Sequence, residues 1–192
     1  MVMKSLIVFA HPNPKSFNYA LVAAVEKVLR ARGDEVRTRD LYKANFNPIL
    51  DSQQLAEVQQ GCVPSDVALE QEQVSWADNL IFIYPLWWFD RPAVLKGWFD
   101  RVFTNGFAFA YEDGQLRGQL GSKRVMLVIT TGGNQADFGV DADQLCASGT
   151  RATLLFCGVS QIVRKVFYAV PAVDDAARQA MLLELEDLVE SL

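Results

Sequence analysis

The chain has 192 residues, of which 51% are hydrophobic and 21% are charged, so it is able to bury a core and is not composed like a disordered protein. Its 18 basic and 23 acidic residues give a net charge of −5 without a long basic cluster, which argues against nucleic acid or an anionic membrane as partner. No apolar run approaches the roughly 20 residues of a membrane span. Three spaced cysteines and a single histidine favour a reduced, cytoplasmic protein and argue against a metal site.

Five segments have the pattern of strands. Residues 6–10, 80–84, 125–130 and 161–167 are apolar and rich in β-branched side chains, and residues 35–41 alternate more polar positions, as an outer strand does. Continuous apolar runs are typical of strands that are covered on both faces, which is the habit of a parallel sheet.

Helical patterns lie between these strands. Leu21, Ala24, Val25, Val28 and Leu29 form one apolar face, with Ser16 as the expected N-cap and Gly33 as the expected stop. A C-terminal stripe follows, capped by Asp174 or Asp175 and made of Ala177, Met181, Leu185, Leu188 and Leu192. The alternation predicts one α/β domain over residues 1–192, a three-layer α/β/α fold with a five-stranded parallel doubly wound sheet, and a partly helical excursion over residues 43–66.

In such a sheet, ligands bind outside the carboxyl ends of the strands, where the strand order reverses. The loop after the first strand, residues 11–18, contains His11, Ser16, Phe17 and Asn18 and ends at a helix N-terminus, which suits a phosphate. The loop lacks the GxxxxGK[ST] and GxGxxG patterns, and an ordinary capped turn is an alternative interpretation.

Two further loops belong to the same edge. "PLWWF" (residues 85–89) offers aromatic faces for a flat ring, although clustered aromatics also build cores and interfaces. "TTGG" (residues 130–133) lets a backbone approach a ligand closely, although two glycines also make an ordinary turn. The three loops together predict a flat aromatic cofactor with a phosphate tail, which is a flavin nucleotide.

The stretches "AHPNPKSFNYAL", "DLYKANFNPIL", "WADNLIFIYPLWWFDRPAVLKGWFDRVF" and "KRVMLVITTGG" resemble the NAD(P)H:quinone oxidoreductase family of flavodoxin-like flavoenzymes. The resemblance implies a flavodoxin-like fold and carries over the following cofactor-binding positions: His11, Ser16, Phe17, Asn18, Pro85, Leu86, Trp87, Trp88, Phe89, Thr130, Thr131, Gly132 and Gly133. It implies FAD or FMN as cofactor, with FAD slightly favoured, and NAD(P)H as co-substrate.

The resemblance also implies a homodimer with the flavin sites at its interface. Trp98, Phe99 and Phe103 are expected to build that interface, while Trp87, Trp88 and Phe89 face the ligand. The expected substrate-binding residues are Trp88, Phe89, Phe138 and, reaching into the site of the partner, Phe109 and Tyr111.

The activity that the resemblance implies is ping-pong hydride transfer from NAD(P)H through flavin N5 to a quinone or a similar electrophile. The family carries a tyrosine and a histidine as a charge relay, and those two positions here hold Phe138 and Gln144. Two kinds of side chain could replace the relay: Tyr111 of the partner subunit, or one acid of the same chain among Asp137, Asp141 and Asp143. The alternatives are a regulatory flavoprotein subunit of a potassium-efflux system and an electron-carrier flavodoxin.

Overall fold

The computed structural model describes residues 2–192 and is built around a five-stranded parallel sheet with the strand order β2-β1-β3-β6-β7. Its strands are β1 (Lys4–Phe9), β2 (Glu35–Asp40), β3 (Asn79–Pro85), β6 (Arg124–Thr130) and β7 (Gln161–Phe167). The predicted doubly wound sheet is therefore confirmed, with every strand within a few residues of its expected position. The strand order reverses between β1 and β3, so a crevice opens at their carboxyl ends.

Burial along the strands follows their place in the sheet. Every residue of the central strand β3 is buried, and β1 and β6 are buried beyond their first residues. The outer strand β2 has no buried residue, which is the polar pattern that its sequence predicts. Central strands covered on both faces need apolar side chains throughout, whereas an edge strand does not.

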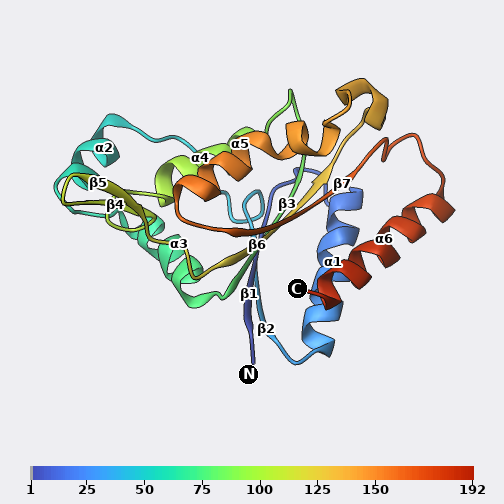
Figure 1. Ribbon diagram of the computed structural model, residues 1–192, viewed down its shortest axis with the longest axis horizontal. Coiled ribbons are helices and arrows are strands. Elements are labelled where there is room, and N and C mark those ends of the chain that lie inside the picture. The colour runs from blue at the N-terminus through green and yellow to red at the C-terminus, as the bar shows by residue number, and fades with distance from the viewer. Residues whose placement is uncertain (1) are drawn as a thin grey trace.

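Helices cover both faces of the sheet (Figure 1). On one face, α1 (Phe17–Ala31) packs beside α6 (Asp175–Glu190), and both contribute to one apolar core. The other face is covered by α3 (Ser65–Trp76), α4 (Ala93–Val102) and α5 (Ala142–Phe156), which share the second and larger core. The predicted three layers are confirmed.

The expected helix ends are also found. Ser16 is the N-cap residue of α1, and Gly33 follows its C-cap with a positive φ of 90°. Asp174 caps α6 by accepting a hydrogen bond from the Ala177 amide at 2.8 Å. Within the excursion, α2 (Ser52–Gln59) forms and α3 begins, as the sequence predicts.

An antiparallel hairpin of β4 (Phe109–Glu112) and β5 (Gln115–Gly118) extends from the rest of the chain, and no strand was expected there. Its strands have four residues each, and none of these residues is buried. A hairpin without a buried face lacks the alternation by which strands are recognised in a sequence. A short 3-10 helix, η1 (Gln135–Phe138), precedes α5.

The expectation that Trp98, Phe99 and Phe103 build a subunit interface is wrong. All three are buried inside the chain's own larger core, with Trp98 and Phe99 packed against Phe82 of β3. The Trp98 indole N–H donates to Glu70 of α3 at 3.0 Å, which satisfies its only polar atom. These aromatics fill the space between α3, α4 and the sheet.

Within residues 2–192, no helix combines the length and the apolar character needed to cross a membrane.

Candidate functional site

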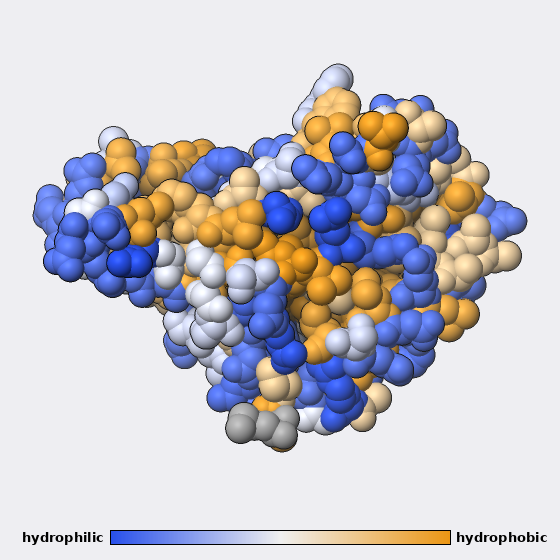
Figure 2. Space-filling view, viewed as in Figure 1, coloured by the Kyte–Doolittle hydropathy of each residue, from blue (hydrophilic) through white to orange (hydrophobic). Residues whose placement is uncertain are grey.

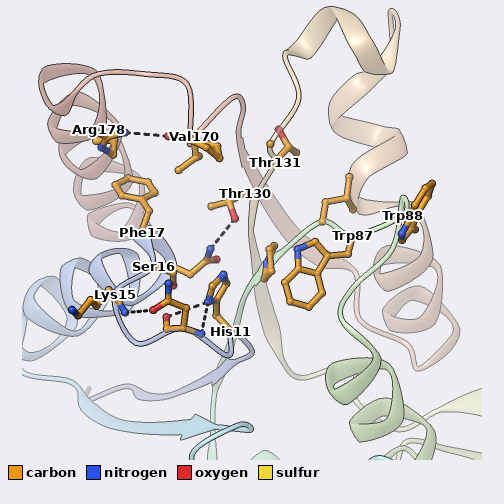
Figure 3. Close-up of a pocket in the computed structure, with 16 residues that line it drawn as sticks. His11, Lys15, Ser16, Phe17, Trp87, Trp88, Thr130, Thr131, Val170 and Arg178 are labelled. Atoms are coloured by element: carbon orange, nitrogen blue, oxygen red, sulfur yellow. Dashed lines mark hydrogen bonds between the residues drawn. The ribbon is translucent and has the colours of Figure 1, made fainter.

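A cleft of about 860 Å³ lies at the carboxyl ends of β1, β3 and β6, and the three predicted loops line it (Figure 3). The structure therefore brings together residues that are more than 100 positions apart in the sequence. The predicted cofactor residues that line the cleft are His11, Ser16, Phe17, Asn18, Pro85, Leu86, Trp87, Trp88, Thr130, Thr131 and Gly132.

The first loop is held in shape by its own hydrogen bonds. Nδ1 of His11 lies 3.0 Å from the Asn13 amide nitrogen and 3.2 Å from the Asn13 carbonyl oxygen, so the ring is held against the backbone of its own loop. The side chain of Asn13 accepts the Lys15 amide proton at 2.9 Å, and the Asn13 carbonyl accepts that of Ser16 at 3.1 Å. This compact turn delivers the chain to the N-terminus of α1 with its polar atoms arranged in advance.

Two polar atoms in this loop are buried and unsatisfied. The hydroxyl of Ser16 does not cap α1, and neither it nor Oδ1 of Asn18 has a hydrogen-bond partner among residues 2–192. The amide group of Asn18 donates to Thr130 Oγ1 at 2.9 Å, which fixes the side chain at the floor of the cleft. Buried polar groups are nearly always paired, so these two atoms indicate a ligand with hydrogen-bonding groups.

The second loop forms the opposite wall. The Leu86 amide donates to the Thr130 carbonyl at 2.8 Å, which continues the β3–β6 pairing into the loop. Trp87 then turns into the cleft, with its ring 6.1 Å from that of His11, while Trp88 lies farther out at the rim (Figure 3). The Trp88 side chain is 96% exposed in the single chain. An indole so exposed offers an uncovered aromatic face.

The third loop closes the floor. The Thr131 amide donates to the Phe167 carbonyl at 2.9 Å, and its hydroxyl donates to the Gly133 carbonyl at 2.8 Å. A Cβ added at Gly132 meets no atom of the described chain within 4 Å, so the space beside it is open to a ligand. A Cβ added at Gly133 lies 2.9 Å from Asp137 Oδ2, because Gly133 faces η1 and not the cleft.

Phe89, like Gly133, is a predicted cofactor residue that does not line the cleft of the described chain. Its ring packs 5.8 Å from Phe138, which packs 5.8 Å from Tyr168. The Tyr168 hydroxyl donates to Asp143 Oδ1 at 2.6 Å. Burial and the Asp143 carboxylate both raise the pKa of Tyr168. An aromatic wall thus extends from the second loop to α5.

The two positions of the family's relay hold residues without a titratable group. Phe138 sits within the aromatic wall, and Gln144 is exposed on α5. The nearest phenol to Phe138 along the wall is Tyr168, which the sequence analysis did not single out. Tyr168 follows β7, and no ligand-binding loop was predicted after that strand, so its place beside Phe138 was not expected.

The cleft has lining residues that the sequence analysis missed: Asn13, Lys15, Val170, Pro171 and Arg178. Asn13 and Lys15 belong to the first loop, beside the residues that were predicted to bind the cofactor. Arg178 lies in the first turn of α6, where it donates to the Val170 carbonyl at 3.2 Å and to Asp175 at 2.6 Å. The sequence signal that could have indicated Arg178 is a basic residue in the first turn of a helix whose N-cap, Asp174, was predicted.

Phe109 and Tyr111 lie on β4 with their rings 6.4 Å apart, outside the cleft of their own chain. Phe109 packs against Phe156 of α5 at 5.2 Å, and Tyr111 is 65% exposed. Their predicted role in the site of a partner stays a prediction.

The cleft is polar at one end and aromatic at the other. Burial lowers the pKa of His11, which favours the neutral form of its ring. Lys15 supplies positive charge at the same end, and Arg178, which is paired with Asp175, also lines the cleft. No group of three or more His, Cys, Asp or Glu side chains in the described chain is placed to hold a metal ion. This arrangement fits a ligand with an anionic tail and a flat ring.

Comparison with known proteins identifies the class. The family model described as "Flavodoxin-like fold" matches residues 3–189, and the chain belongs to this family. An uncharacterized NAD(P)H oxidoreductase of Haemophilus influenzae is 38% identical over 184 residues, which cover 94% of this chain and 91% of that relative.

Two further relatives carry more specific names. The NAD(P)H dehydrogenase [quinone] 1 of Cavia porcellus is 31% identical over 211 residues, with 98% of this chain and 77% of that protein covered. The solved structure of the NAD(P)H:quinone oxidoreductase from Methanothermobacter marburgensis superposes with a TM-score of 0.85 at 32% identity, covering 99% of this chain and 98% of that one.

Proposed function

We propose that this protein is a flavin-dependent NAD(P)H oxidoreductase that passes a hydride to a quinone or a similar electrophile. The observation that carries the proposal is the pair of buried, unpartnered polar atoms on Ser16 and Asn18, in the same cleft as the Trp87 and Trp88 rings. The polar pair suits a phosphate or ribityl group, and the rings suit a flat heterocycle. The names of the relatives support the same activity.

The residues have separable tasks in this proposal. Ser16 and Asn18 bind the phosphate and ribityl groups, with Lys15 and Arg178 neutralising negative charge. The open space beside Gly132 admits the edge of the ring, and Trp87 excludes water from it. When bound, a flavin supplies a ring that accepts a hydride from NAD(P)H and releases it to the acceptor. The protein's part is to position both partners in turn against one ring face.

The test is to record the visible absorbance of the purified protein and to add NADPH or NADH without oxygen. A yellow chromophore that either nucleotide bleaches, and that menadione restores, is the expected result. A yellow protein that neither nucleotide bleaches would move the function to a regulatory or carrier role. A colourless protein that takes up neither FMN nor FAD would overturn the site.

We propose FAD as the flavin. The cleft continues beyond Ser16 to Lys15, Pro171 and Arg178, which gives room and positive charge for a second phosphate. Heat release followed by chromatography distinguishes the two cofactors, and recovery of FMN alone would show that this end of the cleft serves another purpose.

We further propose a cytoplasmic homodimer. Apolar side chains gather over α5 and the β4–β5 hairpin, in the upper left of Figure 2. The exposed large side chains of these elements are Tyr111, Leu116, Leu145, Leu155 and Phe156. Exposed apolar side chains gathered on one part of a surface favour a protein partner, and a second copy could place its Tyr111 near the cleft of the first.

Sedimentation of the wild type and of Phe156→Glu tests the dimer. The variant is expected to sediment as a monomer, whereas Leu183→Glu, at a more exposed position on α6, is the control and keeps the wild-type mass. A monomeric wild type would contradict the proposal.

A further inference from the structure

The turn that carries Trp88 has an unusual backbone. Trp88 and Phe89 have φ values of 52° and 62°, in the left-handed region that non-glycine residues seldom occupy. The flanking residues form an antiparallel bridge, with Trp87 N–H to Asp90 O at 2.9 Å and Asp90 N–H to Trp87 O at 3.1 Å. Two central residues with positive φ between bridged neighbours are the pattern of a type I′ turn, which favours Asn and Gly and not bulky aromatics.

Nothing in the side chain of Trp88 explains this conformation. The indole is 96% exposed, so its own contacts within the chain do not fix its position. The backbone of the turn must therefore place it, and a disfavoured backbone persists only where its surroundings hold it. The turn is the green loop at the top of Figure 1. The groups at its base are the candidates for holding this backbone in place.

Arg91, directly after the turn, is that base. Its amide donates to Asp90 Oδ1 at 2.7 Å, and its guanidinium lies 4.6 Å over the Phe99 ring of α4. Its Nη1 donates to Thr150 Oγ1 of α5 at 3.0 Å, and Tyr84 of β3 donates to the same oxygen at 3.0 Å. The end of the turn is thereby tied to α4, to α5 and to the sheet.

Stability alone does not explain the choice of arginine at this position. Arg91 is only 6% exposed, its Nε has no partner within the described chain, and its nearest carboxylate, Asp90, is 4.0 Å away. Burying an incompletely paired charge is unfavourable, and an apolar side chain of similar volume is often as stabilising. Gly149 leaves room for the arrangement, because a Cβ there would lie 3.3 Å from Asp90 Oδ1 and 3.8 Å from Arg91 Nη1.

We propose that Arg91 is a positioning residue that holds the turn of residues 87–90 in its left-handed conformation, and so presents Trp88 at the rim of the cleft where the electron acceptor binds. The expected effect on acceptor binding rests on the proposed function. The restraint of the turn through the Arg91–Thr150 hydrogen bond does not depend on that function. Because Trp88 lies at the rim and Trp87 deeper in the cleft, loosening the clamp should affect the acceptor more than the flavin.

The variants separate the clamp from general packing. Arg91→Met keeps the apolar stem over Phe99 and removes the N–H donors of the side chain, and Thr150→Val removes the acceptor at nearly constant volume. Tyr84→Phe is the matched control, because it removes the other hydrogen bond to Thr150 and leaves the Arg91–Thr150 bond in place.

In the first two variants, KM for menadione is expected to rise about fivefold or more, while the rate of chromophore bleaching by NAD(P)H stays within about twofold of wild type. Tyr84→Phe is expected to keep the wild-type KM. An unchanged KM in Arg91→Met, or an equal rise in Tyr84→Phe, would overturn the proposal.

Amide exchange followed by mass spectrometry is the second measurement and needs no activity. Residues 86–91 are expected to exchange about tenfold faster in Arg91→Met than in wild type or Tyr84→Phe, because the Trp87–Asp90 bridge opens more often. Equal exchange in all three proteins would refute the clamp. If the wild type showed no bleaching by NAD(P)H, the proposed function would fail and this exchange measurement alone would decide the role of Arg91.

Discussion

The two walls of the cleft are organised in different ways. In the first loop, residues 11–18, side chains accept backbone protons from their neighbours, so the loop is held by its own hydrogen bonds. In the turn of residues 87–90, the two exposed aromatic side chains make no such bonds within the described chain, and the backbone is held from outside by Arg91. The comparison shows a polar wall that is locally determined and an aromatic wall that depends on contacts distant in the sequence.

This difference predicts how the walls respond to change. A substitution in the polar wall should alter flavin binding without altering the fold when the atom removed has no partner in the chain. A substitution in the aromatic wall should alter ligand affinity without altering stability when the ring removed is exposed. Each of the following experiments tests one side of the comparison.

Gly132→Val has the largest expected effect. The space beside Gly132 is open in the described chain and its φ is not positive, so the variant should fold, but its side chain would occupy the site of the ring. We expect loss of flavin binding by about 100-fold or more, with an unchanged circular dichroism spectrum. A variant that retained flavin with wild-type affinity would show that this loop does not contact the ring.

Ser16→Ala comes next. The Ser16 hydroxyl has no partner among the described residues, so its removal should leave the free energy of unfolding unchanged within about 0.5 kcal/mol. A hydrogen bond to a charged phosphate contributes about 1.5–3 kcal/mol, so flavin affinity should fall by about 10-fold or more. Titration of apoprotein with flavin measures this affinity, and Ser148→Ala, which removes a hydroxyl bonded within α5, should not change it.

Trp88→Ala tests the aromatic wall. We expect acceptor turnover or flavin retention to weaken by about 1–3 kcal/mol through the loss of stacking area. Stability in urea should not change, because the indole is almost fully exposed. Leu183→Ala on α6, likewise exposed, is the control. Wild-type turnover and flavin content in Trp88→Ala would contradict a platform role for this ring.

The sequence predicted the sheet and the polar wall well because both are local. Apolar runs mark buried strands, and turn-forming residues before a helix mark its N-terminus, so β3 and the loop ending at Ser16 were found in place. It did not predict the left-handed turn, since Trp88 and Phe89 are residue types that disfavour positive φ. The cause lies in Arg91 and Thr150, which are 59 positions apart.

The same reason explains the wrong and the missing assignments. Trp98 was assigned to an interface because the family resemblance implied a homodimer, and only tertiary packing shows that it fills the core. Arg178 was missed because its distance from the first loop in the sequence hides its place in the cleft. Local patterns identify elements, whereas the partners of a side chain depend on the fold.

Tyr84, beneath the aromatic wall, gives the smallest effect and one that depends on pH. Burial raises the pKa of Tyr84 to about 12, above the value of about 10 in an unfolded chain. The folded state therefore keeps the phenol protonated where the unfolded state ionises. The resulting stability is fully present below about pH 10 and is lost progressively as the pH rises towards 12.

Tyr84→Phe isolates this contribution. At pH 8 the variant should be less stable by about 1 kcal/mol, because the hydrogen bond to Thr150 is lost. Between pH 8 and pH 11 the wild type should lose about 1 kcal/mol that the variant keeps, since the variant has no phenol at this position. The gap in urea denaturation should therefore nearly close at pH 11. Other alkaline effects are shared by both proteins and cancel in the difference, so a gap that stayed constant with pH would contradict a buried, protonated Tyr84.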